Sequence, residues 1–166
     1  MRLVHPTEVA GVRIGPGEDP LARVAEAGLS GEAFLQFPPG HLPLDVLPRL
    51  ARRLEPWVDA HAGSLADALD LAVAGARRIV LDPRAWDGED LDEALDSLGE
   101  DALLACDPVS LAMTAALQQR HPAPLLVAGQ PTHLPEGAFG YLLTSEGNDG
   151  LRLAAFGAWP DAGEEE

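Results

Sequence analysis

Short apolar runs alternate with helix-like segments along the first three quarters of the chain, and this alternation limits the fold more than any other feature. Runs of this length are typical of buried strands, and apolar residues three and four apart between them are typical of amphipathic helices. Strands are expected at residues 3–5 with a continuation at 12–14, and at 33–37, 57–60, 78–81, 102–106 and 125–128. Strands that alternate with helices predict a parallel sheet with right-handed crossovers.

Capping residues mark the helix starts between these strands. Asp19, followed by a proline, and Ser64, followed by an acid three residues later, have the chemistry of N-caps. Asp45 and Asp87 are expected to cap helices at residues 45–54 and 87–99, and a further helix is expected at 109–119. In the helix after Ser64, the spacing predicts one buried face, formed by Leu65, Leu69, Ala72, Val73 and Ala76.

The rhythm changes from residue 130 onward, because residues 131–137 are too few and too proline-rich for a crossover helix. Two closing strands are expected at 139–144 and 151–156, which brings the total to eight. We predict an α/β fold, a small or degenerate (β/α)8 barrel of TIM type with parallel strands and a poorly covered last quarter. Such barrels normally take about 250 residues, so an open Rossmann-like sheet is the alternative. Residues 1–160 would form one barrel-like domain, and residues 161–166 an acidic disordered tail.

The charge balance limits the partners of the chain. There are 27 acidic side chains against 11 basic ones, all of them arginine, and the net charge is −16. A surface this acidic repels phosphate backbones, so no nucleic-acid partner is expected. The lack of lysine excludes Schiff-base enzymes, pyridoxal-phosphate enzymes and P-loops, and no cofactor is expected.

Cysteine usage and hydropathy limit the compartment. The single cysteine, Cys106, can form neither an internal disulfide nor a cysteine-based zinc site. The sequence has no stretch of about 20 apolar residues, and residues 1–6 lack the apolar core of a signal peptide. These features predict a cytoplasmic protein without membrane contact.

In a parallel barrel, the side chains that follow the strands gather at the carboxyl-terminal mouth, where barrel enzymes carry their chemistry. The polar residues expected there are His5, Thr7, Glu8, Asp59, His61, Asp82, Cys106, Asp107, Gln130, Thr144, Ser145 and Glu146. Several carboxylates at one mouth suit acid–base catalysis if burial separates their pKa values. A structural role is the alternative, because Asp82 and Asp107 each precede a proline as helix caps do, and His61 has the setting of an ordinary loop histidine.

Two segments in the middle of the chain carry a family resemblance. Residues 59–69 read Asp-Ala-His-Ala-Gly-Ser-Leu-Ala-Asp-Ala-Leu, and residues 74–81 read Ala-Gly-Ala-Arg-Arg-Ile-Val-Leu. They resemble the turn after strand three, the following helix and the fourth strand of the histidine-biosynthesis barrels. These barrels are the phosphoribosylformimino-aminoimidazole-carboxamide ribotide isomerase and its cyclase relative. The resemblance extends over about residues 1–107 and implies a (β/α)8 barrel.

The resemblance also implies a reaction. The family's isomerase converts an aminoaldose to an aminoketose with an acid–base pair of aspartates on strands one and five. By residue, that pair falls on Glu8 and Asp107, although a glutamate moves its carboxyl by about one methylene. The strand-end positions add a set of substrate-binding candidates: Asp59, His61, Asp82, Thr144 and Ser145.

The phosphate-binding loops of that family are not matched. Asp59 and His61 stand in the turn after strand three, where backbone amides face phosphate in the family. Glu146 adds negative charge after strand seven, and Pro160, after strand eight, has no N–H to donate. The family's grip on phosphate is therefore expected to be lost.

Three functional hypotheses remain open. The first is an isomerase-like enzyme for a small-molecule substrate, with Glu8 and Asp107 as the acid–base pair. The second is a non-catalytic scaffold or partner-binding barrel, favoured by the altered loops and the acidic surface. The third is a metal-dependent hydrolase with Asp59, His61, Asp82 and Asp107 as ligands. Sheet edges left without helices would need cover, which suggests a homodimer.

Overall fold

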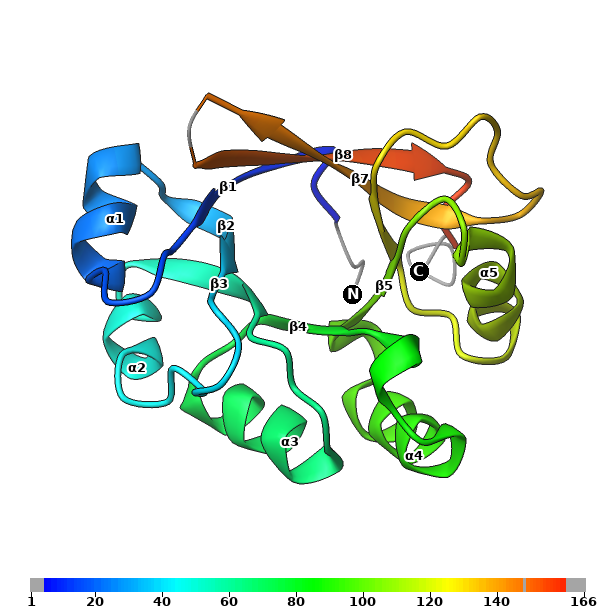
Figure 1. Cartoon of the computed structure of the whole chain (residues 1–166), viewed down its shortest axis with the longest axis horizontal. Helices are drawn as coiled ribbons and strands as arrows, with labels where there is room; N and C mark the ends of the chain where they lie inside the picture. The colour runs from blue at the N-terminus through cyan, green and yellow to red at the C-terminus, as the bar shows by residue number, and fades with distance from the viewer. Residues whose placement is uncertain (1–4, 148, 161–166) are drawn as a thin grey trace, which may run out of the picture.

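A computed structural model describes residues 5–147 and 149–160, and in this part of the chain a single sheet of eight strands closes into a barrel (Figure 1). The strands are β1 (Glu8–Arg13), β2 (Gly31–Gln36), β3 (Leu54–Asp59), β4 (Arg78–Leu81), β5 (Ala102–Cys106), β6 (Leu125–Ala128), β7 (Phe139–Glu146) and β8 (Gly150–Gly157). The helices are α1 (Pro20–Ala27), α2 (Leu47–Leu50), α3 (Leu65–Ala74), α4 (Gly88–Leu98) and α5 (Leu111–Arg120), with short 3₁₀ helices η1 (Pro83–Ala85) and η2 (Gly99–Asp101). The open Rossmann-like alternative is therefore wrong.

The strands run in one direction from β1 to β7, and β8 runs antiparallel to both of its neighbours, β7 and β1. The prediction of an all-parallel barrel is thus wrong for the last strand. β8 runs antiparallel because the connection between β7 and β8 is very short. Glu146 ends β7 and pairs directly with Gly150, which begins β8, so no crossover helix fits between them.

The register determines how far the strands are staggered. The pairing can be followed from strand to strand once around the barrel, starting at Arg13 and passing Gln36 and Asp59. It arrives back in line with the first strand at His5, which is eight residues before Arg13. Eight strands with this stagger enclose a space that side chains can just fill. The interior is accordingly packed with one or two apolar side chains from every strand: Val9, Phe34, Trp57, Val80, Leu103, Leu126, Tyr141, Leu151 and Leu153.

A second, larger apolar cluster lies between the sheet and the helices. Two predicted caps hold these helices as expected. Asp19 accepts a hydrogen bond from the amide of Leu21 at 3.1 Å, and Ser64 accepts one from the amide of Asp67 at 3.1 Å. The buried face of α3 was predicted only in part. Leu65, Ala72 and Ala76 pack against this cluster, but Leu69 and Val73 are 39% and 89% exposed, and Ala68 and Leu71 are buried instead.

The first strand and the second helix also differ from expectation. β1 begins at Glu8, whereas the strand was predicted at residues 3–5, of which 3 and 4 lie outside the described residues. The predicted helix 45–54 shrinks to the four residues of α2. It ends early because Leu54 already belongs to β3, where it pairs with Gly31.

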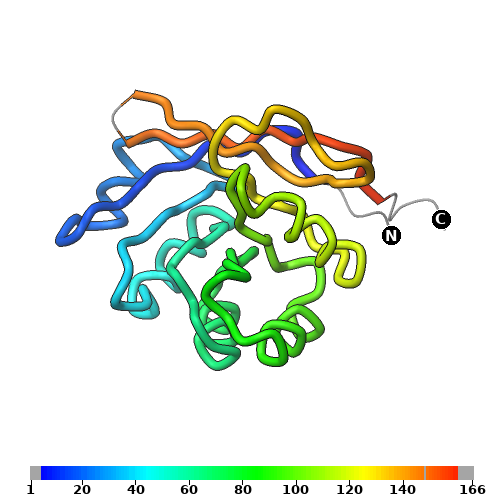
Figure 2. Tube along the Cα trace, turned by 45° about the vertical axis from the view of Figure 1, so that its right-hand side comes forward, coloured from blue at the N-terminus to red at the C-terminus, as the bar shows by residue number. Residues whose placement is uncertain are grey.

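Among the described residues, no helix covers the outside of the last quarter of the barrel. Figure 1 and Figure 2 both show the β7–β8 hairpin lying across one side of the barrel, while the helices line the others. This confirms the poorly covered last quarter. Because β8 pairs on both sides, the described strands leave no open edge, and the homodimer loses the argument that suggested it. The predicted tail, 161–166, lies outside the described residues. Within the described ranges, no helix has the length and apolar character needed to cross a membrane.

Candidate functional site

A cavity of about 380 Å³ opens at the carboxyl-terminal mouth of the barrel, where the ends of β2 to β7 meet. Its floor is made of aliphatic side chains from the barrel interior, among them Val80, Leu126 and Leu143. Its rim is polar and is formed by residues that end strands or directly follow them: Gln36, Asp59, His61, Asp82, Arg84 and Asp107. An apolar floor under a few convergent polar groups is the usual form of a small-molecule site.

Arg84 ties together two of the predicted site residues. Its Nε and Nη2 donate to Oδ1 and Oδ2 of Asp82, both at 2.9 Å, and its Nη1 donates to Oδ2 of Asp107 at 2.8 Å. The guanidinium therefore connects the loops after β4 and β5, and all three of these side-chain hydrogen bonds go to carboxylate oxygens.

Asp82 and Asp107 are also turn residues, as the structural alternative predicted. Asp82 accepts from the amide of Arg84 at 3.0 Å and caps η1. Asp107 accepts from the amide of Ser110 at 2.9 Å, and the Ser110 hydroxyl is 3.1 Å from the same carboxylate oxygen. Both roles coexist, because one carboxylate can accept several hydrogen bonds.

These contacts hold both carboxyl groups in the ionised form. Burial alone would raise the pKa of Asp82, but the hydrogen bonds and charge of Arg84 outweigh it and lower the pKa. The pKa of Asp107 is lowered by hydrogen bonds from the Ser110 amide and hydroxyl, and by Arg84. Neither group is then a good proton donor or a strong base near neutral pH.

Asp59 differs, because most of its hydrogen-bonding capacity is free. One of its oxygens, Oδ2, accepts from Nε2 of Gln36 at 3.3 Å, and no described side chain donates to Oδ1. Gln36 is held in turn by Arg13, whose Nε donates to Oε1 of Gln36 at 2.8 Å. The hydrogen bond from Arg13 determines which end of the Gln36 amide faces Asp59. The Gln36 amide in turn orients the Asp59 carboxylate.

His61 has the one non-glycine backbone with positive φ among the described residues, at 58°. Its Nε2 lies 3.0 Å from the carbonyl oxygen of Phe37. Since a carbonyl only accepts, Nε2 must carry the proton, and in the neutral ring Nδ1 is left as an acceptor. A left-handed backbone at a side chain that lines a cavity is a strain that often accompanies a functional role.

Other predicted site residues lie elsewhere. Glu8 begins β1, so it lies at the opposite end of the barrel from Asp107, and it is 3.4 Å from Nη1 of Arg152. Thr144 and Ser145 pair with β8 and do not line the cavity. Cys106 does line it, but burial and the neighbouring Asp107 raise the pKa of its thiol to about 11, so it stays protonated.

The acid–base pair implied by the family resemblance is therefore not assembled here. Glu8 was expected at the mouth because the first strand was placed too early in the chain. The ligand set of the hydrolase hypothesis, Asp59 with His61, Asp82 and Asp107, is not assembled either. Among the described residues, no three His, Cys, Asp or Glu side chains are close enough to hold a metal ion.

Two residues of the rim were missed by the sequence analysis. Gln36 ends β2, so its position was available from the strand pattern, but residues 33–37 were considered only as a buried strand. Arg84 follows Asp82 by two residues, and its contact with Asp107 depends on β4 and β5 being neighbours.

Comparison of the chain with protein-family models and with curated proteins finds no match to either.

Proposed function

We propose that the chain is a binding barrel whose carboxyl-terminal mouth takes a small, hydroxyl- or amine-bearing ligand without phosphate. The single observation that carries this proposal is the state of the Asp59 carboxylate, which lines the cavity with an uncommitted oxygen. A carboxylate oriented in this way accepts hydrogen bonds from hydroxyl or ammonium groups.

The charges of the rim argue against an anionic ligand. Three carboxylates, of Asp59, Asp82 and Asp107, line the cavity together with one guanidinium, that of Arg84. Arg84 is already bound by two of these carboxylates, so it has little left to offer a phosphate. The mouth is negative in sum, and a neutral or cationic ligand enters it at the lowest electrostatic cost.

The proposal includes a fold of TIM type, in which the last quarter is replaced by an antiparallel hairpin. The stagger of eight residues supports it, because TIM barrels have this same value. Kinship with the histidine-biosynthesis barrels belongs to the same proposal and rests on the resemblance of residues 59–81. The loss of that family's phosphate loops is consistent with an altered ligand.

A second candidate is isomerase-like chemistry on an unphosphorylated sugar, with Asp59 and His61 as the acid–base groups. The strained backbone of His61 favours it, because strain is retained where a side chain must be held in a working position. Glu8 has no part in this version of the reaction. Conversion of an aldose to its ketose, followed by NMR, distinguishes this candidate from binding alone.

Asp59→Asn tests the main proposal. We expect ribose, ribitol or an amino sugar to raise the melting temperature of the wild type, and ribose 5-phosphate to raise it less. Asp59→Asn replaces one acceptor oxygen by a donor and removes the charge, so affinity should fall about tenfold to a hundredfold. Asp70→Asn, an exposed aspartate on α3, is the matched control and should bind like the wild type. Equal binding by wild type and Asp59→Asn, or a preference for the phosphate ester, would show the proposal to be wrong.

A further inference from the structure

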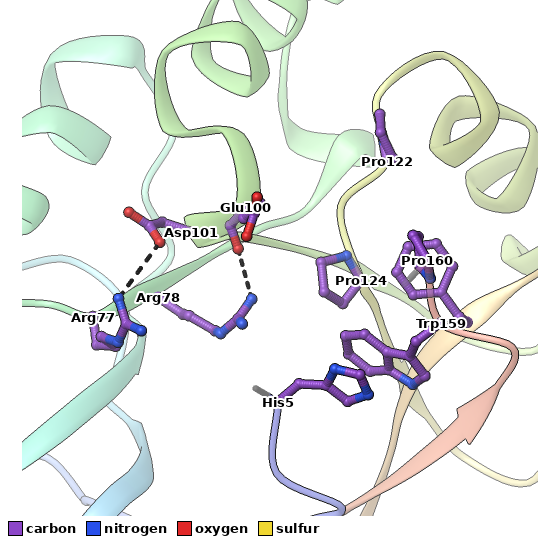
Figure 3. A pocket seen from close by; sticks show the side chains of 10 residues that line it. His5, Arg77, Arg78, Glu100, Asp101, Pro122, Pro124, Trp159 and Pro160 are labelled. Atoms are coloured by element: carbon purple, nitrogen blue, oxygen red, sulfur yellow. Dashed lines mark hydrogen bonds and ion pairs between the residues drawn. The ribbon is translucent and has the colours of Figure 1, made fainter. Parts of the chain in front are cut away.

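A second cavity, of about 240 Å³, lies at the amino-terminal end of the barrel, away from the mouth described above. Figure 3 shows its two sides: Arg77 and Arg78 reach toward Glu100 and Asp101 on one, and His5 and Trp159 stack on the other. Phe139 and three prolines, Pro122, Pro124 and Pro160, complete the wall. The cavity is therefore apolar on one side and charged on the other, where the two guanidiniums stand beside the carboxylates of Glu100 and Asp101.

Of the two arginines in this cavity, Arg78 is the one with no carboxylate partner among the described residues. Its Nη1 donates to the backbone oxygen of Glu100 at 2.6 Å, and its guanidinium lies 4.9 Å from the ring centre of Trp57. Its Nε is buried without a hydrogen-bond partner, and no described carboxylate lies within 4.0 Å of the guanidinium. The nearby carboxylate of Glu32 is engaged by Nε1 of Trp57 at 2.9 Å.

The neighbouring Arg77 differs from Arg78 in both its exposure and its ion pairs. Arg77 is about half exposed and has two carboxylate partners, Glu55 at 3.3 Å and Asp101 at 4.0 Å. Arg78 is less exposed, and burial lowers the pKa of its guanidinium, although Tyr141, Glu32 and the more distant Asp101 oppose that effect. A partly buried charge without a partner is costly, so a ligand anion that contacts Arg78 would be held more strongly than one at Arg77.

The opposite wall is flat and aromatic. The rings of His5 and Trp159 stack at 3.9 Å with an angle of 13°, and Trp159 also contacts Phe139 at 5.0 Å between ring centres. Burial, followed by the charge of Arg78, lowers the pKa of His5, so its ring is neutral near pH 7. This wall therefore offers apolar faces and no second cation.

We propose that the amino-terminal cavity binds a small carboxylate with a flat apolar body, its carboxylate on Arg78 and its body against Trp159 and Pro124. A guanidinium is well suited to a carboxylate, because two of its N–H groups can contact both oxygens. A flat apolar body displaces water from the rings and prolines, which a bare anion cannot do. This site is independent of the mouth and of the function proposed for it.

Benzoate and its neutral counterpart benzamide test the inference on the wild-type chain. NMR titration should show saturable benzoate shifts at the indole N–H of Trp159 and at His5. Benzamide, which has the same body without the charge, should bind at least about tenfold more weakly. Acetate, which has the charge without the ring, should also bind more weakly. Benzoate shifts confined to other parts of the barrel, or equal affinities for benzoate and benzamide, would overturn the proposal.

Arg78→Gln supplies the residue-level test. Benzoate affinity should fall about tenfold or more, because the charged hydrogen bonds are lost. Arg77→Gln, next in the chain but already paired, should change it about threefold or less, and Arg84→Gln at the other end of the barrel should leave it unchanged. If Arg78→Gln does not fold because the contact with Trp57 is lost, Arg78→Lys takes its place, since lysine keeps the positive charge. The comparison of benzoate with benzamide on the wild type then decides whether the proposal holds, without any variant. An equal loss in Arg77→Gln would reduce the site to general electrostatic attraction and would refute it.

Discussion

Arg84 is the side chain on which the geometry of the carboxyl-terminal mouth depends most. It forms ion pairs with both Asp82 and Asp107, and the two loops that carry these aspartates have no other side-chain bond to one another among the described residues. Its own pKa is raised by the hydrogen bonds to Asp82, so it remains charged at any pH at which the chain is folded. The side chains of Arg84, Asp82 and Asp107 are each more than a third exposed, so solvent weakens these ion pairs. They therefore position the side chains more than they stabilise the fold.

Arg84→Gln should raise the pKa of Asp82 and Asp107 toward the ordinary value of 3.8, and ¹³C NMR titration of the carboxyl carbons measures this. Because both values are lowered in the folded state, their stabilising contribution is present above the ordinary pKa and is lost as the pH falls through the folded value. The variant should consequently lose less stability than the wild type on acidification below about pH 4. Asp107 should stay partly lowered, since the Ser110 amide remains. A variant in which both pKa values are unchanged would contradict this account of the tie.

At the residue scale, the sequence predicted positions better than roles. Asp59, His61, Asp82 and Asp107 do line one mouth, because each ends or closely follows a strand in a run of parallel strands. Whether Asp82 and Asp107 serve as caps or as site residues could not be decided from the sequence, because they do both. Glu8 was misplaced because apolar residues 3 and 4 resemble a strand more than the glycine-containing segment that forms β1.

Among the elements, α5 compensates for the missing crossover helix after β6. The side chain of Gln118, only 4% exposed, donates from Nε2 to the backbone oxygens of Ala123 and Phe139, at 2.7 and 2.8 Å. Its Oε1 accepts from the amide of Phe139 at 3.2 Å. One side chain thereby holds the approach to β6 and the start of β7.

Gln118→Ala should leave three buried backbone groups without partners and lower the free energy of unfolding by about 3 kcal/mol or more. Urea denaturation measures the change. Gln119→Ala, at the exposed neighbouring position, is the control and should stay within about 0.5 kcal/mol of the wild type. A loss of similar size in both variants would mean that helix α5, and not the Gln118 contacts, is being weakened.

Elements that pack by an ordinary rule were predicted closely. The bounds of β4, β5 and β6 agree with the expected 78–81, 102–106 and 125–128, because short apolar runs buried on both faces have clear ends. The buried face of α3 was predicted less closely, because the helix buries Ala68 and Leu71 and leaves Leu69 and Val73 outside. Apolar residues lie on most sides of this helix, and hydrophobic periodicity alone cannot decide which of them face the sheet.

The whole molecule carries a net charge of −16, which should make its stability depend on salt. Repulsion among unpaired carboxylates destabilises the compact state, and salt screens it over about 10 Å at 0.1 M. We expect the urea midpoint to rise between about 0.01 M and 0.5 M salt, with NaCl and KCl equivalent at equal ionic strength. A midpoint that falls with salt would mean that attractive ion pairs dominate, and a marked difference between the two salts would indicate specific ion binding.

For the molecule as a whole, the number and order of strands were predictable, and the direction of the last one was not. Eight apolar runs predicted eight strands, and the chain order is kept around the barrel. Direction depends on whether the link from β7 to β8 is a turn or a crossover, and the chain between Glu146 and Gly150 is short enough only for a turn. This observation was available in the sequence, but the expected regular alternation concealed it.

The reversed last strand also has a mechanical consequence. His5 and Trp159, near the two ends of the described chain, meet at one end of the β1–β8 ladder. Tension applied there acts along hydrogen bonds that lie across the strands, so it breaks them one after another, from Glu8 opposite Ala154 to Val12 opposite Gly150. A parallel eighth strand would share the load among all the bonds of the ladder. The line between β1 and β8 is thus the one along which this barrel would unzip when its ends are pulled.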